Sequence, residues 1–160
     1  MTDEATADVY DRLEGTARTR TAQLRSYGGR VRFSGVIDTV RCREDNVLVR
    51  TALSRPGHGR VLVIDGEGSL RTALLGDVLA HLARGNGWAG VIVHGAVRDV
   101  AGLREIHFGV AALGSNPRRS GKAGTGTAGE PVCFGDVVFT PGDTVHVDED
   151  GVVLVPHGAD

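Results

Sequence analysis

The sequence predicts a mixed α/β fold in a single domain. Its 160 residues are enough for one domain with a substantial core. Two short, continuous apolar runs, "VLVIDG" (61–66) and "GVIVHG" (90–95), are typical of buried strands, and a segment with helical periodicity lies between them. Near the C-terminus, short apolar runs alternate with turn sequences, which indicates antiparallel strands.

The N-terminal part is expected to form a helix and then strand structure. Residues 6–25 carry apolar side chains at helical spacing, with Thr6 as a candidate cap, and "YGG" at 27–29 ends this pattern. Residues 30–42 are rich in β-branched and aromatic side chains, which predicts a strand or a bent pair of strands. A further apolar run, "NVLVRTAL" (46–53), follows.

The middle of the chain predicts alternating strands and helices. Residues 70–75 are expected to form a short extended piece, after which a helix runs from about Gly76 to Arg84 and ends at "GNG" (85–87). After the strand at 90–95, residues 99–106 predict a short helix and residues 109–114 another strand.

The last third separates into a loop and a β unit, which completes one domain over 1–160. Residues 115–131 are polar and glycine-rich without hydrophobic periodicity, which predicts a loop. Residues 132–156 predict a small antiparallel β unit, and the acidic run Asp148–Asp150 before a glycine is typical of a hairpin turn.

Composition excludes several classes of function. A formal net charge of −2 and 4% aromatic residues argue against direct nucleic-acid binding, which needs a basic surface and stacking platforms. No apolar run is long enough to span a membrane, and the N-terminus lacks the pattern of a signal peptide. Cys42 and Cys133 fit no metal-finger spacing and are expected to be reduced thiols. We therefore expect a cytoplasmic protein without membrane contact.

The glycine-rich loop contains two incomplete nucleotide-binding patterns. Its G-x-G-x-x-G, formed by Gly124, Gly126 and Gly129, precedes a proline and a strand instead of opening a helix. Lys122 is followed by Ala123, whereas a phosphate loop needs Ser or Thr there. A loop that lies over a site or a subunit interface is the favoured interpretation.

Two segments are candidates for a binding site. Gly76, Asp77, Val78 and Leu79 begin a predicted helix, whose N-terminal N–H groups can bind an anion. Arg98 can bind a carboxylate through two hydrogen bonds, and Asp99 is a hard oxygen ligand suited to Mg²⁺ or Mn²⁺. Alternatively, Asp99 caps the following helix and Arg98 is solvated. The spacing alone leaves both interpretations open.

The sequence resembles the RraA-like family over nearly its whole length. The resemblance rests on "TADVYD", "SYGG", "RVLVIDGEGSLRTALLGDVLAHLARGNGWAGVIVHGAVRDV", "GVAALGSNPR" and "VCFGDVVFTPGDTVHVDEDGVVLV", which occur in this order. The family contains regulator of ribonuclease activity A and the metal-dependent 4-hydroxy-4-methyl-2-oxoglutarate aldolases. The resemblance implies a swivelling β/β/α domain that assembles as a homotrimeric ring or a dimer of such rings, with sites between subunits.

The resemblance also implies a class II pyruvate aldolase site, often with oxaloacetate decarboxylase activity, which releases pyruvate through a metal-stabilised enolate. The substrate-binding backbone of the family falls on Gly76, Asp77, Val78 and Leu79. Its substrate arginine falls on Arg98 and its metal carboxylate on Asp99, so both are implied catalytic residues. The implied cofactor is Mg²⁺ or Mn²⁺, and the implied substrate is a small 2-oxo acid.

One departure from the family pattern concerns the acidic residue that usually follows the metal aspartate by three positions. Here that position is Gly102, so aldol cleavage is in question and decarboxylation is expected to survive better. The alternative function is a non-catalytic regulator that binds and inhibits a ribonuclease E-type enzyme. That branch can lose the metal aspartate, and its retention here as Asp99 favours a metal site.

Overall fold

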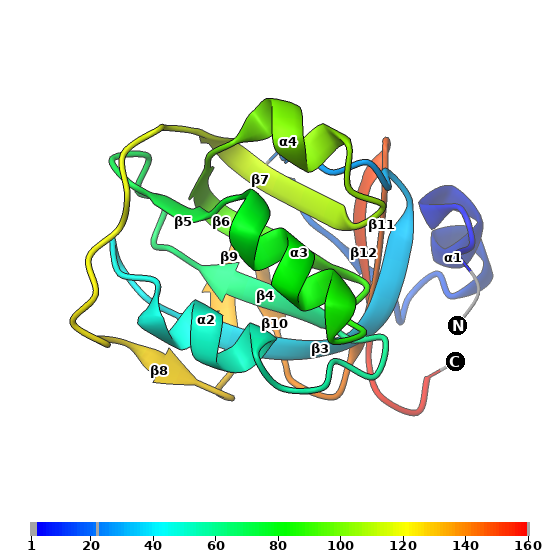
Figure 1. Ribbon diagram of the computed structural model, residues 1–160. Coiled ribbons are helices and arrows are strands. Elements are labelled where there is room, and N and C mark those ends of the chain that lie inside the picture. Colours follow the sequence, from blue (N-terminus) through cyan, green and yellow to red (C-terminus); the bar gives the residue numbers. More distant parts are fainter. Residues whose placement is uncertain (1–2, 22, 160) are drawn as a thin grey trace.

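A computed structural model describes residues 3–21 and 23–159, which form a curved, mixed β-sheet with the later helices over its central strands and the N-terminal helix beside its C-terminal strands (Figure 1). Over this part of the chain the strand order is β1-β12-β11-β3-β4-β6-β7-β2, with β5 paired to β6 and β8 to β3, while β9 and β10 form a separate hairpin. The strands are β1 (Arg18–Thr19), β2 (Arg25–Ser26), β3 (Phe33–Arg41), β4 (Val61–Asp65), β5 (Ala73–Leu75), β6 (Gly90–Val97), β7 (Gly109–Ser115), β8 (Thr127–Ala128), β9 (Val132–Phe134), β10 (Val137–Phe139), β11 (Thr144–Asp148) and β12 (Gly151–Val155). The helices are α1 (Thr6–Arg12), α2 (Val47–Leu53), α3 (Asp77–Gly85) and α4 (Val100–Arg104).

The centre of the sheet is parallel and covered on both faces. Strands β3, β4, β6 and β7 pair in parallel, and the register of β4 with β6 runs from Val61 opposite Gly90 to Asp65 opposite His94. Every residue of β4 is buried, which confirms the strand that its continuous apolar run predicts. In a parallel sheet the carboxyl ends of neighbouring strands lie at one edge, and this arrangement positions the site described below.

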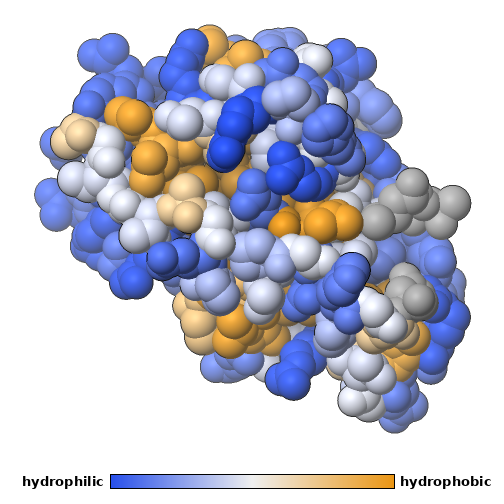
Figure 2. All heavy atoms as spheres, turned by 90° about the horizontal axis from the view of Figure 1, so that it is seen from below, coloured by the Kyte–Doolittle hydropathy of each residue, from blue (hydrophilic) through white to orange (hydrophobic). Residues whose placement is uncertain are grey.

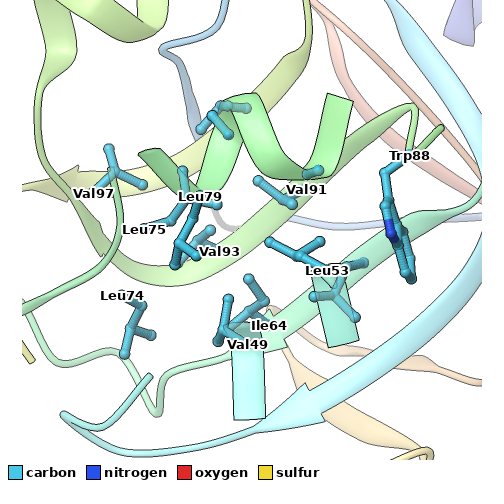
Figure 3. Packing of buried hydrophobic residues seen from close by; sticks show 14 of the residues in the cluster. Val49, Leu53, Ile64, Leu74, Leu75, Leu79, Trp88, Val91, Val93 and Val97 are labelled. Carbon is cyan, nitrogen blue, oxygen red and sulfur yellow. The ribbon is translucent and has the colours of Figure 1, made fainter. Parts of the chain in front are cut away.

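Helices α2 and α3 pack against one face of the sheet (Figure 3). Val49 and Leu53 of α2 and Leu79 of α3 point toward the side chains of Ile64, Val91 and Val93. The opposite face packs against the β9–β10 hairpin and against β11 and β12, and this second core includes Phe33, Phe134 and Phe139. Burial of these apolar faces is the main favourable contribution to folding.

The predicted helix over residues 6–25 is wrong beyond Arg12, and Thr6 is not its cap. Ala5 occupies the N-cap position, and the N–H and hydroxyl of Thr6 donate to the two carboxylate oxygens of Asp148 at 2.8 and 2.7 Å. After the helix, Gly15 adopts a φ of 90°, and β1 pairs with β12. Pairing with an existing strand and packing of Ala17 in the small core beside α1 outweigh the helical periodicity. Residue 22 lies outside the described residues.

The later helices and strands agree more closely with those predicted from the sequence. The short extended piece becomes β5, and the helix predicted from Gly76 to Arg84 is α3 with Gly76 as its N-cap. The apolar run 46–53 forms α2, because Val49, Ala52 and Leu53 supply one buried helix face. The predicted C-terminal β unit divides: β9 and β10 form their own hairpin, whereas β11 and β12 join the main sheet through β3.

The face shown in Figure 2 is mostly hydrophilic, with its apolar area in separate patches. Within residues 3–21 and 23–159, the large apolar side chains that are exposed are those of Tyr10, Val31, Leu70, Val78 and Val138. Among the described residues, no helix is both long and apolar enough to cross a membrane.

Arg20 is a buried cation beside the β9–β10 hairpin. Its side chain is 8% exposed, and its guanidinium lies 4.9 Å from the centre of the Phe134 ring. None of its three guanidinium nitrogens has a hydrogen-bond partner within residues 3–21 and 23–159. Burial lowers the pKa of Arg20, because the charged form has lost its water.

We expect Arg20→Met to stabilise the protein. Methionine keeps the apolar contact with Phe134 and removes a buried charge without a partner, so the free energy of unfolding should rise by about 1–3 kcal/mol. Urea denaturation measures this change. Arg18→Met, at an exposed position of the same strand region, is the control and should stay within about 0.5 kcal/mol of the wild type. A clear loss of stability in Arg20→Met would contradict the expectation.

Asp148 contributes stability that depends on pH. Burial raises the pKa of its carboxyl, but hydrogen bonds from Thr6 and from the N–H of Asp150 outweigh this effect and hold the pKa below its ordinary value. An unfolded aspartate titrates at about pH 3.9, so the stabilisation is complete above that pH and is lost as the pH falls through the lower, folded pKa. Asp148→Asn should therefore cost about 1 kcal/mol at neutral pH and less in acid. Urea denaturation at several pH values checks this, and a cost independent of pH would contradict it.

Candidate active site

The candidate site is built where β5 and β6 end at the same edge of the sheet. Leu75 in β5 lies opposite Val97 in β6, and the N–H of Arg98 donates to the carbonyl of Leu75 at 3.0 Å. Beyond these strands, β5 leads through Gly76 into α3, and β6 leads through Arg98 and Asp99 into α4. The parallel pairing therefore brings the two predicted segments together.

Asp99 occupies the N-cap position of α4, but its carboxylate does not cap that helix. Its backbone is left-handed, with φ 56° and ψ 42°, and the side chain makes no cap hydrogen bond. Its Oδ2 instead accepts the N–H of Asp77, the first residue of α3, at 3.2 Å. Aspartate adopts this conformation more readily than most non-glycine residues, and four other non-glycine residues of the described chain also have a positive φ. Asp99 is therefore not a cap of α4, and its carboxylate lies instead at the N-terminus of α3.

Gly76 provides the space that Asp99 needs. A Cβ atom on Gly76 would lie 2.4 Å from Oδ2 of Asp99 and 3.2 Å from Cγ of Arg98. The backbone of Gly76 is extended, so the absence of a side chain matters here for close approach and not for conformation. Any larger residue would force the carboxylate away from the N-terminus of α3.

Arg98 lies beside this carboxylate. Its Nε is 3.9 Å from Oδ2 of Asp99, and its Nη1 donates to the carbonyl of Pro117 at 3.3 Å. The Arg98 and Asp99 side chains are 37% and 40% exposed, so both reach solvent and a ligand can contact them.

These groups line a cavity of about 260 Å³, which is large enough for a small organic acid and a few water molecules. Of the predicted residues, Gly76, Val78, Leu79, Arg98 and Asp99 line it, whereas the Asp77 side chain does not. The structure adds lining residues that sequence reasoning did not assign to the site: Asn46, Arg50, Ala73, Leu75, Arg119, Ser120 and Lys122. Arg119, Ser120 and Lys122 lie in the glycine-rich loop, for which a position over a site is one of the two predicted roles.

The glycine-rich loop is attached to the cavity wall by side-chain hydrogen bonds. The hydroxyl of Ser120 donates to the carbonyl of Ala73 at 2.7 Å. The Nζ of Lys122 donates to Oδ1 of Asn46 at 2.5 Å, and Nδ2 of Asn46 donates to the carbonyl of Leu74. These contacts were not visible in the sequence because they join residues that are 28 to 76 positions apart.

The charged side chains that line the cavity are mostly cationic. Four cationic side chains, those of Arg50, Arg98, Arg119 and Lys122, face a single carboxylate, Asp99. Arginine and lysine in this arrangement bind carboxylates or other oxyanions through charge-assisted hydrogen bonds. The lining therefore fits a small ligand that carries more than one negative charge.

A divalent cation could be held in this site by one carboxylate, that of Asp99. Among the described residues, no group of three or more His, Cys, Asp or Glu side chains comes together. Mg²⁺ often binds through one or two carboxylates and keeps several water ligands, so the accessible carboxylate of Asp99 is a suitable anchor. A site of this kind would be completed by water and by the oxygens of an anionic substrate.

Gly102 lies beside the Asp77 carboxylate. A Cβ atom on Gly102 would be 3.1 Å from Oδ2 of Asp77. The space where an acidic side chain at position 102 would begin is therefore next to a carboxylate that is already present. Glu105 is at the other end of α4 and does not line the cavity.

The chain is thus a mixed α/β protein with a cation-lined cavity at the carboxyl edge of its sheet. Residues 6–154 match the RraA-like family, described as Aldolase/RraA, and the chain belongs to this family. The family includes aldolases and decarboxylases as well as inhibitors of ribonuclease E.

Solved structures show the same relationship. A crystal structure described as an S-adenosylmethionine:2-dimethylmenaquinone methyltransferase from Geobacillus kaustophilus is 45% identical, with 96% of each chain covered and a TM-score of 0.95. The RNA-processing inhibitor RraA from Thermus thermophilis is also 45% identical, with 98% of this chain and 94% of that chain covered and a TM-score of 0.94. RraAS2 from Streptomyces coelicolor is 27% identical, with 96% and 80% covered and a TM-score of 0.78.

We expect Gly76→Ala to disturb the site while the fold persists. The added methyl group would collide with Asp99, so Mn²⁺ affinity should fall at least about tenfold, as measured by isothermal titration calorimetry. Gly85→Ala is the matched control at the other end of α3, where a Cβ meets no atom within 4 Å. It should leave Mn²⁺ affinity unchanged, and equal affinities for the two variants would contradict the role of Gly76.

Proposed function

We propose that this protein is a divalent-metal-dependent lyase that releases pyruvate from small 2-oxo acids with a second carboxylate. Oxaloacetate, cleaved by decarboxylation, and 4-hydroxy-4-methyl-2-oxoglutarate, cleaved by a retro-aldol reaction, are the substrates that belong to this class. The observation that carries the proposal is the placement of Arg98 and Asp99 side by side against the N-terminus of α3, in a cavity with three further cations.

The first task of the site is to bind the pyruvyl carboxylate. The N–H groups of Val78 and Leu79 precede the first hydrogen bond within α3, which runs from Ala80 to Gly76, so they can bind an anion at the cavity wall. The guanidinium of Arg98 can donate two parallel hydrogen bonds to the same end of the substrate. Together these groups orient the 2-oxo acid with its carbonyl near Asp99.

Cleavage of the carbon–carbon bond leaves negative charge on the keto oxygen as an enolate. Asp99 would hold the divalent cation, which supplies Lewis-acid stabilisation of that charge when it is bound. Arg98 stabilises the same charge with donors that are already in place, because its side chain is held by Pro117 and Asp99.

The two reactions differ in their need for a base. Loss of carbon dioxide from oxaloacetate requires only an electron sink and no base, and the enolate that remains takes a proton from water to become pyruvate. Retro-aldol cleavage also requires a group that removes the hydroxyl proton. Gly102 offers no such group, so we propose that decarboxylation is the stronger of the two activities.

The family also suggests an assembly and a second candidate function. We propose that the chain forms a homotrimer, alone or as a dimer of trimers, with sites near the contacts between subunits. The second candidate is a regulator that binds and inhibits a ribonuclease, and the 45% identity to the Thermus RNA-processing inhibitor favours it. That function predicts binding without metal-dependent turnover.

The decisive test compares the wild type with Asp99→Ala. In the presence of Mg²⁺ or Mn²⁺, the wild type should release pyruvate from oxaloacetate, and Asp99→Ala should lose at least about a hundredfold in kcat/KM, as is typical when a group that stabilises the transition state is removed. A coupled pyruvate assay with a metal-free blank measures this. Equal release by the two proteins would contradict the proposal, and ribonuclease binding without turnover would support the second candidate.

A further inference from the structure

The glycine-rich loop reaches the cavity through Lys122, and a buried carboxylate holds the residues directly after it. Asp45 is 4% exposed and lies just before α2. Its Oδ2 accepts the N–H groups of Ala123 at 2.6 Å and Gly124 at 3.0 Å, and its Oδ1 accepts the N–H of Val47 at 3.1 Å. One side chain therefore joins the loop to the first turn of α2.

Backbone contacts reinforce this attachment on both sides of Asp45. The N–H of Gly121 donates to the carbonyl of Glu44 at 2.8 Å, and the N–H of Asn46 donates to the carbonyl of Gly121 at 3.3 Å. Lys122 is thus held between Gly121 and Ala123, and its Nζ is directed onto Asn46 at the cavity wall.

The charge of Asp45 matters for this attachment. Burial raises the pKa of its carboxyl, but hydrogen bonds from four backbone N–H groups, those of Val47, Ala123, Gly124 and Thr125, outweigh this effect and hold the pKa below its ordinary value. An amide at this position would have one oxygen instead of two for these donors, and its NH₂ group would face N–H groups. An asparagine can therefore satisfy only part of the arrangement.

The centre at Arg98 and Asp99 is attached independently of Asp45. Arg98 is held by the carbonyls of Leu75 and Pro117, and Asp99 by the N–H of Asp77. The segment around Pro117 has its own anchors: the N–H of Asn116 donates to the carbonyl of Val97, and its side-chain amide donates to Leu70. Loss of the Asp45 contacts should loosen Lys122 without moving Arg98 or Asp99.

We propose that Asp45 is a positioning residue that sets Lys122 to bind the second carboxylate of a dicarboxylic 2-oxo acid. This inference rests on the proposed function and adds a basis for selecting dicarboxylates over monocarboxylates. Arg98 and the N-terminus of α3 bind the end that both kinds of acid share. Lys122 contacts only the end that a dicarboxylate has in addition.

The test uses four variants: Asp45→Asn, Lys122→Met, the double variant, and Asp148→Asn as the matched control. Asp148 also accepts backbone N–H groups and also has a lowered pKa, but it lies at the β11–β12 hairpin and does not line the cavity. With oxaloacetate, Asp45→Asn and Lys122→Met should each raise KM about tenfold with kcat within about twofold. Asp148→Asn should leave both constants unchanged.

The double variant distinguishes positioning from a general loss of structure. If Asp45 acts through Lys122, its substitution should have no further effect on KM once Lys122 is methionine. Independent, multiplying effects would overturn the inference.

Binding measurements test the role of Asp45 even if the protein does not decarboxylate oxaloacetate. In calorimetry with Mg²⁺ present, Asp45→Asn should weaken binding of 2-oxoglutarate, which has a second carboxylate and is not decarboxylated in this way, and leave pyruvate binding unchanged. Equal weakening of both ligands would overturn the inference. Absence of oxaloacetate turnover in the wild type would instead contradict the proposed function and leave the binding comparison valid.

Hydrogen exchange on the wild type needs no variant and covers the case in which Asp45→Asn does not fold. The amides of Ala123 and Gly124 should be protected because they donate to Asp45. Protection across residues 121–124 should increase with 2-oxoglutarate and stay constant with pyruvate. Unprotected amides, or an equal response to the two acids, would overturn the inference.

Discussion

The parallel pairing of β5 with β6 is the contact on which the cavity depends. It places Leu75 beside Val97, and the hydrogen bond from Arg98 to Leu75 continues the pairing by one residue beyond the strand. The N-terminus of α3 and the side chains of Arg98 and Asp99 then meet at one edge of the sheet. A shift of one residue in this register would turn alternate side chains to the opposite face and separate the two segments.

The backbone conformation of Asp99 shows how local and tertiary effects compete. An aspartate before a short helix usually caps that helix with its own carboxylate. Here the left-handed conformation points the carboxylate at the N-terminus of α3, where the absence of a side chain on Gly76 leaves room for it. A left-handed non-glycine residue costs of order 1–3 kcal/mol, which the surrounding packing has to offset.

The charged residues that line the cavity come from three kinds of segment: a strand end, a helix and a loop. Arg98 and Asp99 follow a strand, Arg50 projects from α2, and Arg119 and Lys122 come from the glycine-rich loop. The loop has no hydrophobic periodicity of its own, so its position depends on polar anchors, chiefly Asp45, Asn46 and Ser120. This division leaves the centre at Arg98 rigidly attached to the sheet, while the other wall depends on hydrogen bonds that a single substitution can remove.

Elements with local signals could be predicted from the amino-acid sequence. Continuous apolar runs predicted β4 and β6, helical periodicity with terminal glycines predicted α3, and the adjacent charges after β6 marked Arg98 and Asp99 as candidates. The structure brings these candidates together with Gly76, although their catalytic and metal-binding roles remain proposals. Long-range contacts determine three further features: the N-terminal helix ends at Arg12, the C-terminal strands divide between two sheets, and Asn46, Arg50 and Lys122 line the cavity. These features depend on contacts between residues far apart in the chain, and neither local propensity nor spacing contains the free energy of such contacts.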